Sequence, residues 1–556
     1  MMLASSTLPV PHVAYSVIGP EVVMVVGALV LLTIAALRRS PLPHAFTTSL
    51  TCSVAVVSLV WSLHVWSRVV GAGKHGFTAV DSAIAVDGFS ALILVLVSVA
   101  LFLSALASAS FLRRESMEGP EFAVLLMLSS AGAMLMGAAN DLIVLFLGLE
   151  IMSIALYVLA GSNLRRRQSG EAAIKYFVLG AFSSAIFLYG IALVYGATGS
   201  TNLSAIATFL TTSVIVHNGV LLAGMAFLLV GLGFKVAAVP FHTWAPDVYQ
   251  GAPTPAVSFM AAVAKAGGFA GLLRVVYSTL GTLQIDWKPV IWALAVLSLV
   301  VGAVLAVVQR DVKRMLAYSS VSHAGFVLIG LAAASGRGIA GSLYYLFAYT
   351  FMVIGAFTVA QVVSGTGDSR HDLEDYRGLI RRQPFLAIGM SVFLLAQAGV
   401  PFTTGFLAKF SVVSAVAEAH SYALAVIAMV SAAIAAFFYL RVVGYMFSTG
   451  TGGEASAVVQ PGAGTASVRF SVGDAPSAAP LPAFEHSAAA VAVMDEEVVA
   501  SVGTTPALAE APAAPLFAGV PFGPAVVIAL SGAVTVVFGI WAQPLLDFAR
   551  HATLLF

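Results

Sequence analysis

Residues 233–244 read GFKVAAVPFHTW, and residues 396–406 read AQAGVPFTTGF. Both stretches contain the motif Val-Pro-Phe-x-Thr, at Val239–Thr243 and at Val400–Thr404. Each proline falls inside or at the end of an otherwise apolar segment of helical length. Because proline lacks a backbone N–H donor and clashes with the carbonyl group four residues earlier, both helices are predicted to break there.

The composition indicates that these helices lie in a lipid bilayer. Of the 556 residues, 60% are hydrophobic and 9% are charged, and the mean hydropathy is +0.99. Soluble domains are about 25% charged. The formal net charge is +1, so we expect no basic face that binds nucleic acid. The predicted fold class is an all-α polytopic membrane protein.

Apolar stretches near the length of about 20 residues that a bilayer requires recur along the chain. We predict about fourteen transmembrane helices, of which the seventh and the twelfth carry the proline motifs. The approximate spans are 20–37, 45–66, 88–112, 121–138, 141–160, 172–196, 217–239, 255–280, 289–308, 312–334, 339–364, 384–417, 421–448 and 522–547.

The basic residues predict the orientation. If the N-terminus lies outside, sixteen of the 26 basic residues fall on the inner side, six on the outer side, and four within spans. This bias agrees with the positive-inside rule. No Lys or Arg precedes Arg38, so we expect a retained first helix and not a cleaved signal peptide. The predicted location is the bacterial plasma membrane.

One long segment is not predicted to lie in the membrane. Residues 449–520 are rich in Ala, Pro, Gly, Ser and Val and carry seven acidic residues against one base, Arg469. This composition predicts a flexible, acidic cytoplasmic loop. The stretch Arg370–Gln383 is amphipathic and is expected to lie along the inner membrane surface.

The two motif helices lie five spans apart and therefore have opposite orientations in the membrane. This arrangement is typical of an inverted-topology repeat with ion sites at broken helices. It predicts two five-helix units with breaks in helices 7 and 12. The expected division is 1–120 (helices 1–3), 121–280 (helices 4–8), 281–448 (helices 9–13), 449–520 (the loop) and 521–556 (helix 14).

Four charged residues lie deep within apolar spans: Glu150, Lys235, Lys265 and Lys409. Each costs about 2.5–3.5 kcal/mol at the bilayer centre, and four unpaired charges cost on the order of 10 kcal/mol. We interpret them as protonatable groups of an ion pathway, in which movement of Glu150 toward or away from Lys235 would load or unload a proton. The alternatives are fixed ion pairs between helices and, for Lys235 and Lys409, snorkelling to the interface.

Three further residues are candidates for a proton relay. His242 lies beside the first break, and His323 lies in the polar run YSSVSHAG (Tyr318–Gly325). Their ordinary pKa near 6.5 suits proton transfer, although a lone histidine is often a satisfied core residue. Lys175 follows Glu171 at spacing i, i+4, so a surface ion pair is an equal alternative to a relay role.

The chain shows no pattern for cofactor or metal chemistry. Its single cysteine, Cys52, cannot supply the roughly four thiolates of an iron–sulfur cluster. The sequence also contains no phosphate loop, no HExxH motif and no catalytic triad. We therefore expect no cofactor-binding or metal-binding residues in this chain.

Several motifs resemble those of a known family. The stretch GFKVAAVPFHTWAPDVYQGAPTP (Gly233–Pro255) resembles a signature of the antiporter-like membrane subunits of respiratory complex I. Within it, PDVYQGAP is similar to subunit N of NADH-quinone oxidoreductase more than to subunits L or M. LGLEIMSIALYVLAG (Leu147–Gly161), RDVKRMLAYSSVSHAG (Arg310–Gly325) and VPFTTGFLAKF (Val400–Phe410) fit the same family.

The resemblance implies a role for each buried charge. The family's helix-5 glutamate falls on Glu150, and its lysines of helices 7, 8 and 12 fall on Lys235, Lys265 and Lys409. It also implies fourteen spans and a hydrated polar axis along the membrane that includes His323. The implied partners are the neighbouring antiporter-like and small membrane subunits, with flavin and iron–sulfur clusters in other subunits. The loop 449–520 is longer than the family pattern requires.

Three functions follow as hypotheses. The first is a proton-translocating subunit of an NADH-quinone oxidoreductase, an enzyme complex whose redox chemistry takes place in partner subunits. The second is a subunit of a multisubunit cation/proton antiporter. The third is a membrane scaffold that moves no protons and whose buried charges form fixed ion pairs.

Overall fold

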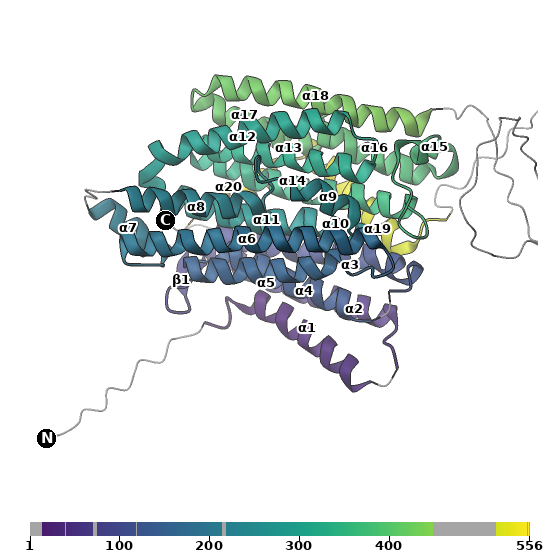
Figure 1. Ribbon diagram of the computed structural model, residues 1–556, viewed down its shortest axis with the longest axis horizontal. Helices are drawn as coiled ribbons and strands as arrows, with labels where there is room; N and C mark the ends of the chain where they lie inside the picture. Colours follow the sequence, from purple (N-terminus) through teal and green to yellow (C-terminus); the bar gives the residue numbers. More distant parts are fainter. Residues whose placement is uncertain are drawn as a thin grey trace, which may run out of the picture. The chain divides into compact units, whose positions relative to one another are not determined.

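A computed structural model describes residues 14–38, 40–70, 75–117, 119–213, 218–448, 519–552 and 554. Almost all of the predicted loop 449–520 lies outside these residues. The described part is nearly all helical, and the long helices run roughly side by side (Figure 1). The predicted all-α fold is confirmed.

Twelve helices of the described residues are long and apolar enough to cross a membrane. Ten of them are single α-helices, one is α12 together with the short turn η3 that precedes it, and one is the composite α10–η2. They are α1 (Gly19–Leu37), α2 (His44–Val69), α3 (Gly88–Arg114), α4 (Glu121–Ala138), α5 (Leu142–Ala160), α6 (Arg167–Thr198), α10–η2 (Thr254–Thr279), η3 and α12 (Gly281–Val307), α13 (Val312–Ala332), α14 (Gly336–Val363), α18 (Tyr422–Phe447) and α19 (Phe522–Ile540).

The two remaining predicted spans are the two helices with proline motifs. The seventh corresponds to α8 (Gly219–Lys235), a break and α9 (Trp244–Gly251). The twelfth corresponds to α16 (Pro384–Ala398), a break and α17 (Thr404–Glu418). Both predicted breaks are present, and each helix ends a few residues before its proline. The halves are shorter than a full span, so the total of fourteen stays a prediction.

Shorter elements, most of them unpredicted, connect the long helices. They are β1 (Phe77–Ala79), β2 (Ile84–Val86), α7 (Leu203–Thr212), η4 (Leu373–Tyr376), α15 (Leu379–Arg382) and α20 (Gln543–His551). The two strands form an antiparallel hairpin in which Phe77 pairs with Val86. η4 and α15 fall within the stretch 370–383 that was expected to lie along the membrane surface.

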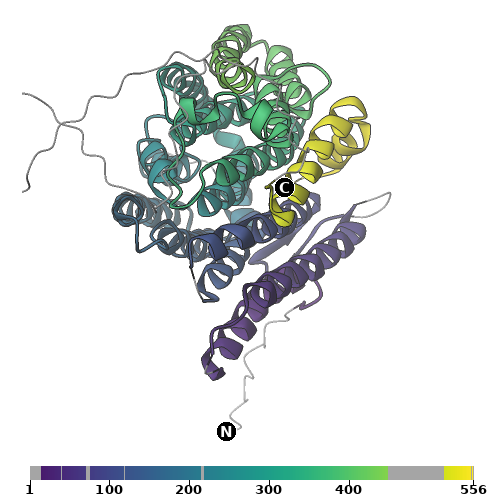
Figure 2. The same ribbon diagram turned by 90° about the vertical axis from the view of Figure 1, so that its right-hand side faces the viewer.

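The composite helix 254–279 is the centre of the molecule, and every residue of its most apolar window is buried. It consists of α10 (Thr254–Phe259), the π-helical turn η1 (Met260–Ala264), α11 (Lys265–Leu273) and the π-helical turn η2 (Arg274–Thr279). By contrast, α1 and α2 expose long apolar faces and lie at one side of the bundle (Figure 2). Exposed apolar helix faces suit a lipid or a neighbouring membrane subunit.

Close backbone contact sets the position of α5, which carries Glu150. Gly132 of α4 faces α5, and a Cβ atom at this position would lie 2.5 Å from the backbone nitrogen of Met152. Only glycine therefore allows the two helices to approach this closely, as is common in membrane bundles.

Candidate functional site

The first buried lysine, Lys235, is the last residue of α8 and is 3% exposed. Its Nζ donates hydrogen bonds to Ser153 Oγ at 2.8 Å and to Tyr176 OH at 3.4 Å. The Nζ also lies 5.6 Å from the centroid of the Tyr176 ring. The ammonium group is therefore held by neutral oxygen atoms and a π face.

Glu150 lies one turn before Ser153 on α5 and is half-buried. Its carboxylate interacts electrostatically with the Lys235 ammonium. Among the described residues, however, no carboxylate oxygen lies within 4.0 Å of Lys235 Nζ. Glu150 Oε1 is buried and has no hydrogen-bond partner in the described part of the chain. The two groups are thus close enough to influence each other without forming a direct ion pair.

The central lysine, Lys265, is 4% exposed and follows directly after the π-helical turn η1. Such wide turns are rare and often occur at functional sites. Its Nζ donates a hydrogen bond to the Ser320 carbonyl oxygen of α13 and lies 5.7 Å from the Tyr349 ring centroid. The stem of Lys235 packs against the same central helix, because a Cβ atom on Gly268 would lie 3.2 Å from Lys235 Cγ.

His323 is one turn after Ser320 on α13 and is 3% exposed. Its Nδ1 lies 2.6 Å from Tyr345 OH, and its Nε2 lies 3.0 Å from Tyr439 OH. A hydroxyl group can either donate or accept. This environment can therefore satisfy a neutral imidazole and also an imidazolium ion, which would donate from both nitrogens.

The polar contacts continue from His323 to the second break. Tyr439 OH contacts Ser319 Oγ and donates to Gln397 Oε1 at 3.3 Å. The next residue, Ala398, accepts a 2.9 Å hydrogen bond from Lys409 Nζ. Lys409 is 7% exposed, and its charge, like that of Lys265, acts on His323. The structure therefore brings Lys265, His323 and Lys409 into one buried cluster.

The remaining two candidates lie apart from this cluster. The His242 ring is half-buried in the first break, 6.5 Å from the Tyr318 ring, and its Nδ1 has no hydrogen-bond partner among the described residues. Lys175 is 44% exposed and forms ion pairs with Glu171 at 2.8 Å and Asp247 at 3.1 Å. Its contacts are those of the surface ion pair, and its relay role stays a prediction.

Two other cations, Arg274 and Lys313, are also buried. Arg274 forms a bidentate ion pair with Asp87 of the helix α3 cap, at 2.8 and 3.0 Å. Lys313 lies 3.4 Å from Asp368, which also binds Arg166 at 2.9 Å. Both pairs join segments that lie far apart in the sequence.

Sequence reasoning did not single out the polar residues around the buried lysines and His323. These are Ser153, Tyr176, Ser319, Ser320, Tyr345, Tyr349, Gln397 and Tyr439. One available signal was the spacing of Tyr345 and Tyr349, which places both hydroxyl groups on one face of an apolar helix. The described residues contain no group of three or more His, Cys, Asp or Glu side chains that could hold a metal ion.

Comparison with known proteins identifies the family. The family model for NADH:quinone oxidoreductase/Mrp antiporter transmembrane proteins matches residues 139–435. The NADH-quinone oxidoreductase subunit N of Trichlorobacter lovleyi is 42% identical over 392 residues, which cover 69% of this chain and 80% of that protein. Subunit N of Mycobacterium tuberculosis is 49% identical over 343 residues, covering 61% of this chain and 64% of that protein.

Solved structures have the same fold. A chain of respiratory complex I from Thermus thermophilus with bound aureothin is 28% identical, with a TM-score of 0.70 over 95% of this chain and 98% of its own. A chain of the Mrp complex from Dietzia sp. shares the fold at 20% identity, with a TM-score of 0.70 over 97% of this chain and 95% of its own. The chain therefore belongs to the NADH:quinone oxidoreductase/Mrp antiporter family of membrane proteins, as do the two subunits N to which it is similar.

Proposed function

We propose that this chain is a proton-translocating membrane subunit of an NADH-quinone oxidoreductase. In this proposal, flavin and iron–sulfur chemistry take place in partner subunits, and neighbouring membrane subunits flank this chain in a bacterial plasma membrane. The N-terminus lies outside and the loop 449–520 lies in the cytoplasm. The two repeat units are 121–280 and 281–448, with 1–120 and 521–556 as flanking helices.

One contrast within the molecule carries the proposal. The buried cations Arg274 and Lys313 each have a carboxylate within 4.0 Å. Lys235, Lys265 and Lys409 are similarly buried, yet their hydrogen bonds go to hydroxyl and carbonyl oxygens. A scaffold needs paired charges, because an unpaired charge is costly in the membrane. A lysine that is bound only by neutral groups can lose and regain its proton without leaving the negative charge of a carboxylate unpaired in the membrane.

The mechanism we infer is a relay along the membrane. A proton on Lys235, favoured when the Glu150 carboxylate approaches, passes to Lys265, then through His323 to Lys409. Ser320 Oγ and Tyr349 OH are buried beside Lys265 without hydrogen-bond partners among the described residues, so they offer binding positions for bridging water. Moving one proton against 100 mV requires about 2.3 kcal/mol, which equals a pKa change of somewhat less than about two units.

The test uses the whole complex in sealed vesicles. Lys235→Ala and Lys265→Ala complexes are expected to assemble and to lose proton pumping per NADH oxidised, while a Lys288→Ala complex pumps normally because Lys288 lies near the exposed start of α12. Normal pumping by both assembled lysine variants would contradict the proposal and favour a scaffold.

The cation/proton antiporter remains the second candidate, because the matching family model covers both groups of proteins. Purification of the chain from its native membrane separates the two hypotheses. Flavin and iron–sulfur subunits in the purified assembly support the oxidoreductase, whereas an assembly that lacks them and exchanges Na⁺ for protons supports the antiporter.

A further inference from the structure

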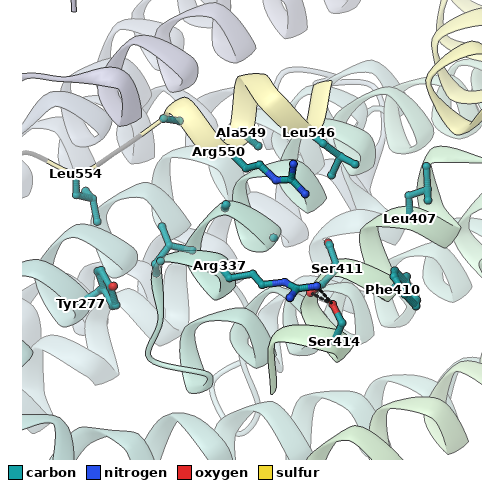
Figure 3. A pocket seen from close by; sticks show the side chains of 15 residues that line it. Tyr277, Arg337, Leu407, Phe410, Ser411, Ser414, Leu546, Ala549, Arg550 and Leu554 are labelled. Carbon is teal, nitrogen blue, oxygen red and sulfur yellow. Dashed lines mark hydrogen bonds between the residues drawn. The ribbon is translucent and has the colours of Figure 1, made fainter. Parts of the chain in front are cut away.

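A cavity of about 710 Å³ is lined by none of the buried lysines (Figure 3). It is surrounded by helix ends: η2 ends at Thr279, α14 begins at Gly336, and α17 ends at Glu418. The short helix α20 closes one side. Because membrane-spanning helices end near the lipid headgroups, the end of this cavity that Arg337 lines lies at the level of the membrane interface.

The cavity is polar and basic at one end. Arg337 and Arg550 both line it, and their side chains extend into the same space (Figure 3). Ser411 and Ser414 of α17 also line this end of the cavity, and Arg337 donates a hydrogen bond to Ser414 Oγ at 3.4 Å (Figure 3). Arg337 forms an ion pair with Glu418, and Arg550 lies 3.5 Å from Asp547, but neither carboxylate lines the cavity. Each guanidinium has five N–H donors and so retains donors for a ligand.

The other end of the cavity is apolar and extends toward the membrane interior. Leu407 and Phe410 continue the α17 wall, and Leu407 is seven residues, or about 10 Å, deeper than Ser414. Phe410 is 59% exposed and stacks on Phe406 with ring centroids 6.2 Å apart. The cavity therefore leads from two guanidinium groups to an apolar end lined by Leu407 and Phe410.

We propose that this cavity binds one anionic phospholipid. The phosphate group lies between Arg337 and Arg550, which can bind phosphate oxygens through paired N–H groups, and Ser411 and Ser414 donate further hydrogen bonds. One acyl chain follows Leu407 and Phe410 into the bilayer. Free phosphate would contact only the polar end of the cavity and would leave its apolar end at Leu407 and Phe410 empty.

The test measures lipid retained by the purified, delipidated complex that contains this chain. Dioleoylphosphatidylglycerol is added back, and bound lipid per complex is counted by native mass spectrometry. The Arg337→Gln/Arg550→Gln complex is expected to bind it at least about tenfold more weakly, equivalent to about 1.4 kcal/mol. Arg377→Gln is the matched control, because Arg377 forms an exposed ion pair with Glu374 beyond the far end of α14.

Further measurements distinguish the possible occupants. Ala340→Trp narrows the cavity without a change in charge and should also lower lipid binding. Dioleoylphosphatidylcholine should bind more weakly than phosphatidylglycerol, and inorganic phosphate should not displace the lipid. Equal lipid binding by wild-type and double-variant complexes would overturn the proposal. Displacement of the lipid by phosphate would also overturn it. If the double variant loses a neighbouring subunit while its lipid binding is unchanged, the occupant is a polypeptide and the proposal is wrong.

Discussion

Lys409 Nζ donates a 2.9 Å hydrogen bond to the carbonyl oxygen of Ala398, the last residue of α16. The final carbonyl groups of a helix have no partner within the helix, and they carry the negative end of its dipole. The break therefore creates an acceptor for a cation where an unbroken helix would have none. Lys235 is itself the last residue of the other broken helix, α8. At one break a lysine therefore ends the first half of the helix, and at the other a lysine binds the end of the first half.

This contact predicts the effect of removing the charge. Lys409→Met should leave assembly intact, because methionine is unbranched and close to lysine in length, although it loses the contact of the ammonium group with the Phe326 ring. Proton pumping should fall about tenfold or more, the equivalent of 1.4 kcal/mol or one pKa unit. Dye quenching in NADH-energised vesicles measures the rate. Lys288→Met is the control, and unchanged pumping in the Lys409 variant would remove Lys409 from the pathway.

The two tyrosines around His323 provide a second prediction. Tyr345→Phe and Tyr439→Phe each remove one hydroxyl partner of the imidazole and should cost about 1 kcal/mol of stability each. Both should slow pumping, and His323→Leu should slow it further because no titratable group remains. Tyr344→Phe serves as control, since the Tyr344 hydroxyl has no hydrogen-bond partner among the described residues. Equal pumping by all four variants would contradict the relay.

The Asp87–Arg274 pair predicts a different pattern, because it serves structure. Both side chains are 2% exposed. Asp87→Asn or Arg274→Gln alone should destabilise the chain by about 3–5 kcal/mol, whereas Asp87→Leu with Arg274→Met should cost much less. Thermal unfolding of the detergent-solubilised complex measures the difference. If the double variant loses as much unfolding free energy as the two single variants added together, the two residues are not coupled.

Asp368 predicts a pH effect outside the membrane-spanning helices. Burial alone would raise the pKa of this carboxyl group, but Lys313, His371 and Thr254 together hold it well below its usual value. The unfolded chain has an ordinary pKa near 3.9, so the folded state binds fewer protons at acid pH. The stabilisation by Asp368 is therefore complete above about pH 4. It is lost only as the pH falls through the lower pKa of the folded state.

The Asp368→Asn variant tests this direction of the pH dependence of stability. At pH 7 the variant should be about 3–5 kcal/mol less stable, because Lys313 remains buried without its carboxylate. The difference in unfolding temperature between wild type and variant should stay constant from pH 8 to pH 5 and shrink only in stronger acid. A difference that already shrinks between pH 7 and pH 5 would contradict the low pKa.

The sequence predicted the helices well because hydropathy reports directly on a membrane environment. The expected span 20–37 became Gly19–Leu37, and 422–447 lies within the expected 421–448. The two breaks were predicted because proline affects its own helix. The π-helical turns were not predicted, since nothing local in MAAVA (Met260–Ala264) demands them and the packing of neighbouring helices decides.

The same distinction applies to the candidate site. Glu150, Lys235, Lys265 and Lys409 could be found because a charge in an apolar run is conspicuous. Tyr439 could not, because a tyrosine is common in membrane helices and its contact with His323 joins residues 116 positions apart. Asp87 caps α3, because its carboxylate accepts a hydrogen bond from the Ser90 backbone N–H. Its ion pair with Arg274 spans 187 positions and depends on the folded arrangement alone.

The π-helical turn before Lys265 determines the direction in which Lys265 and the following side chains of the central helix point. Each residue advances an α-helix by about 100°, and a π turn accommodates one residue more than an α turn. Deletion of Ala262 would restore regular winding and rotate Lys265 by about a quarter of a revolution away from the Ser320 carbonyl group, with the lysine itself unchanged. The direction of the Lys265 side chain thus depends on the number of residues in this turn. Insertion or deletion of a single alanine here would abolish the function of Lys265 as effectively as its replacement would.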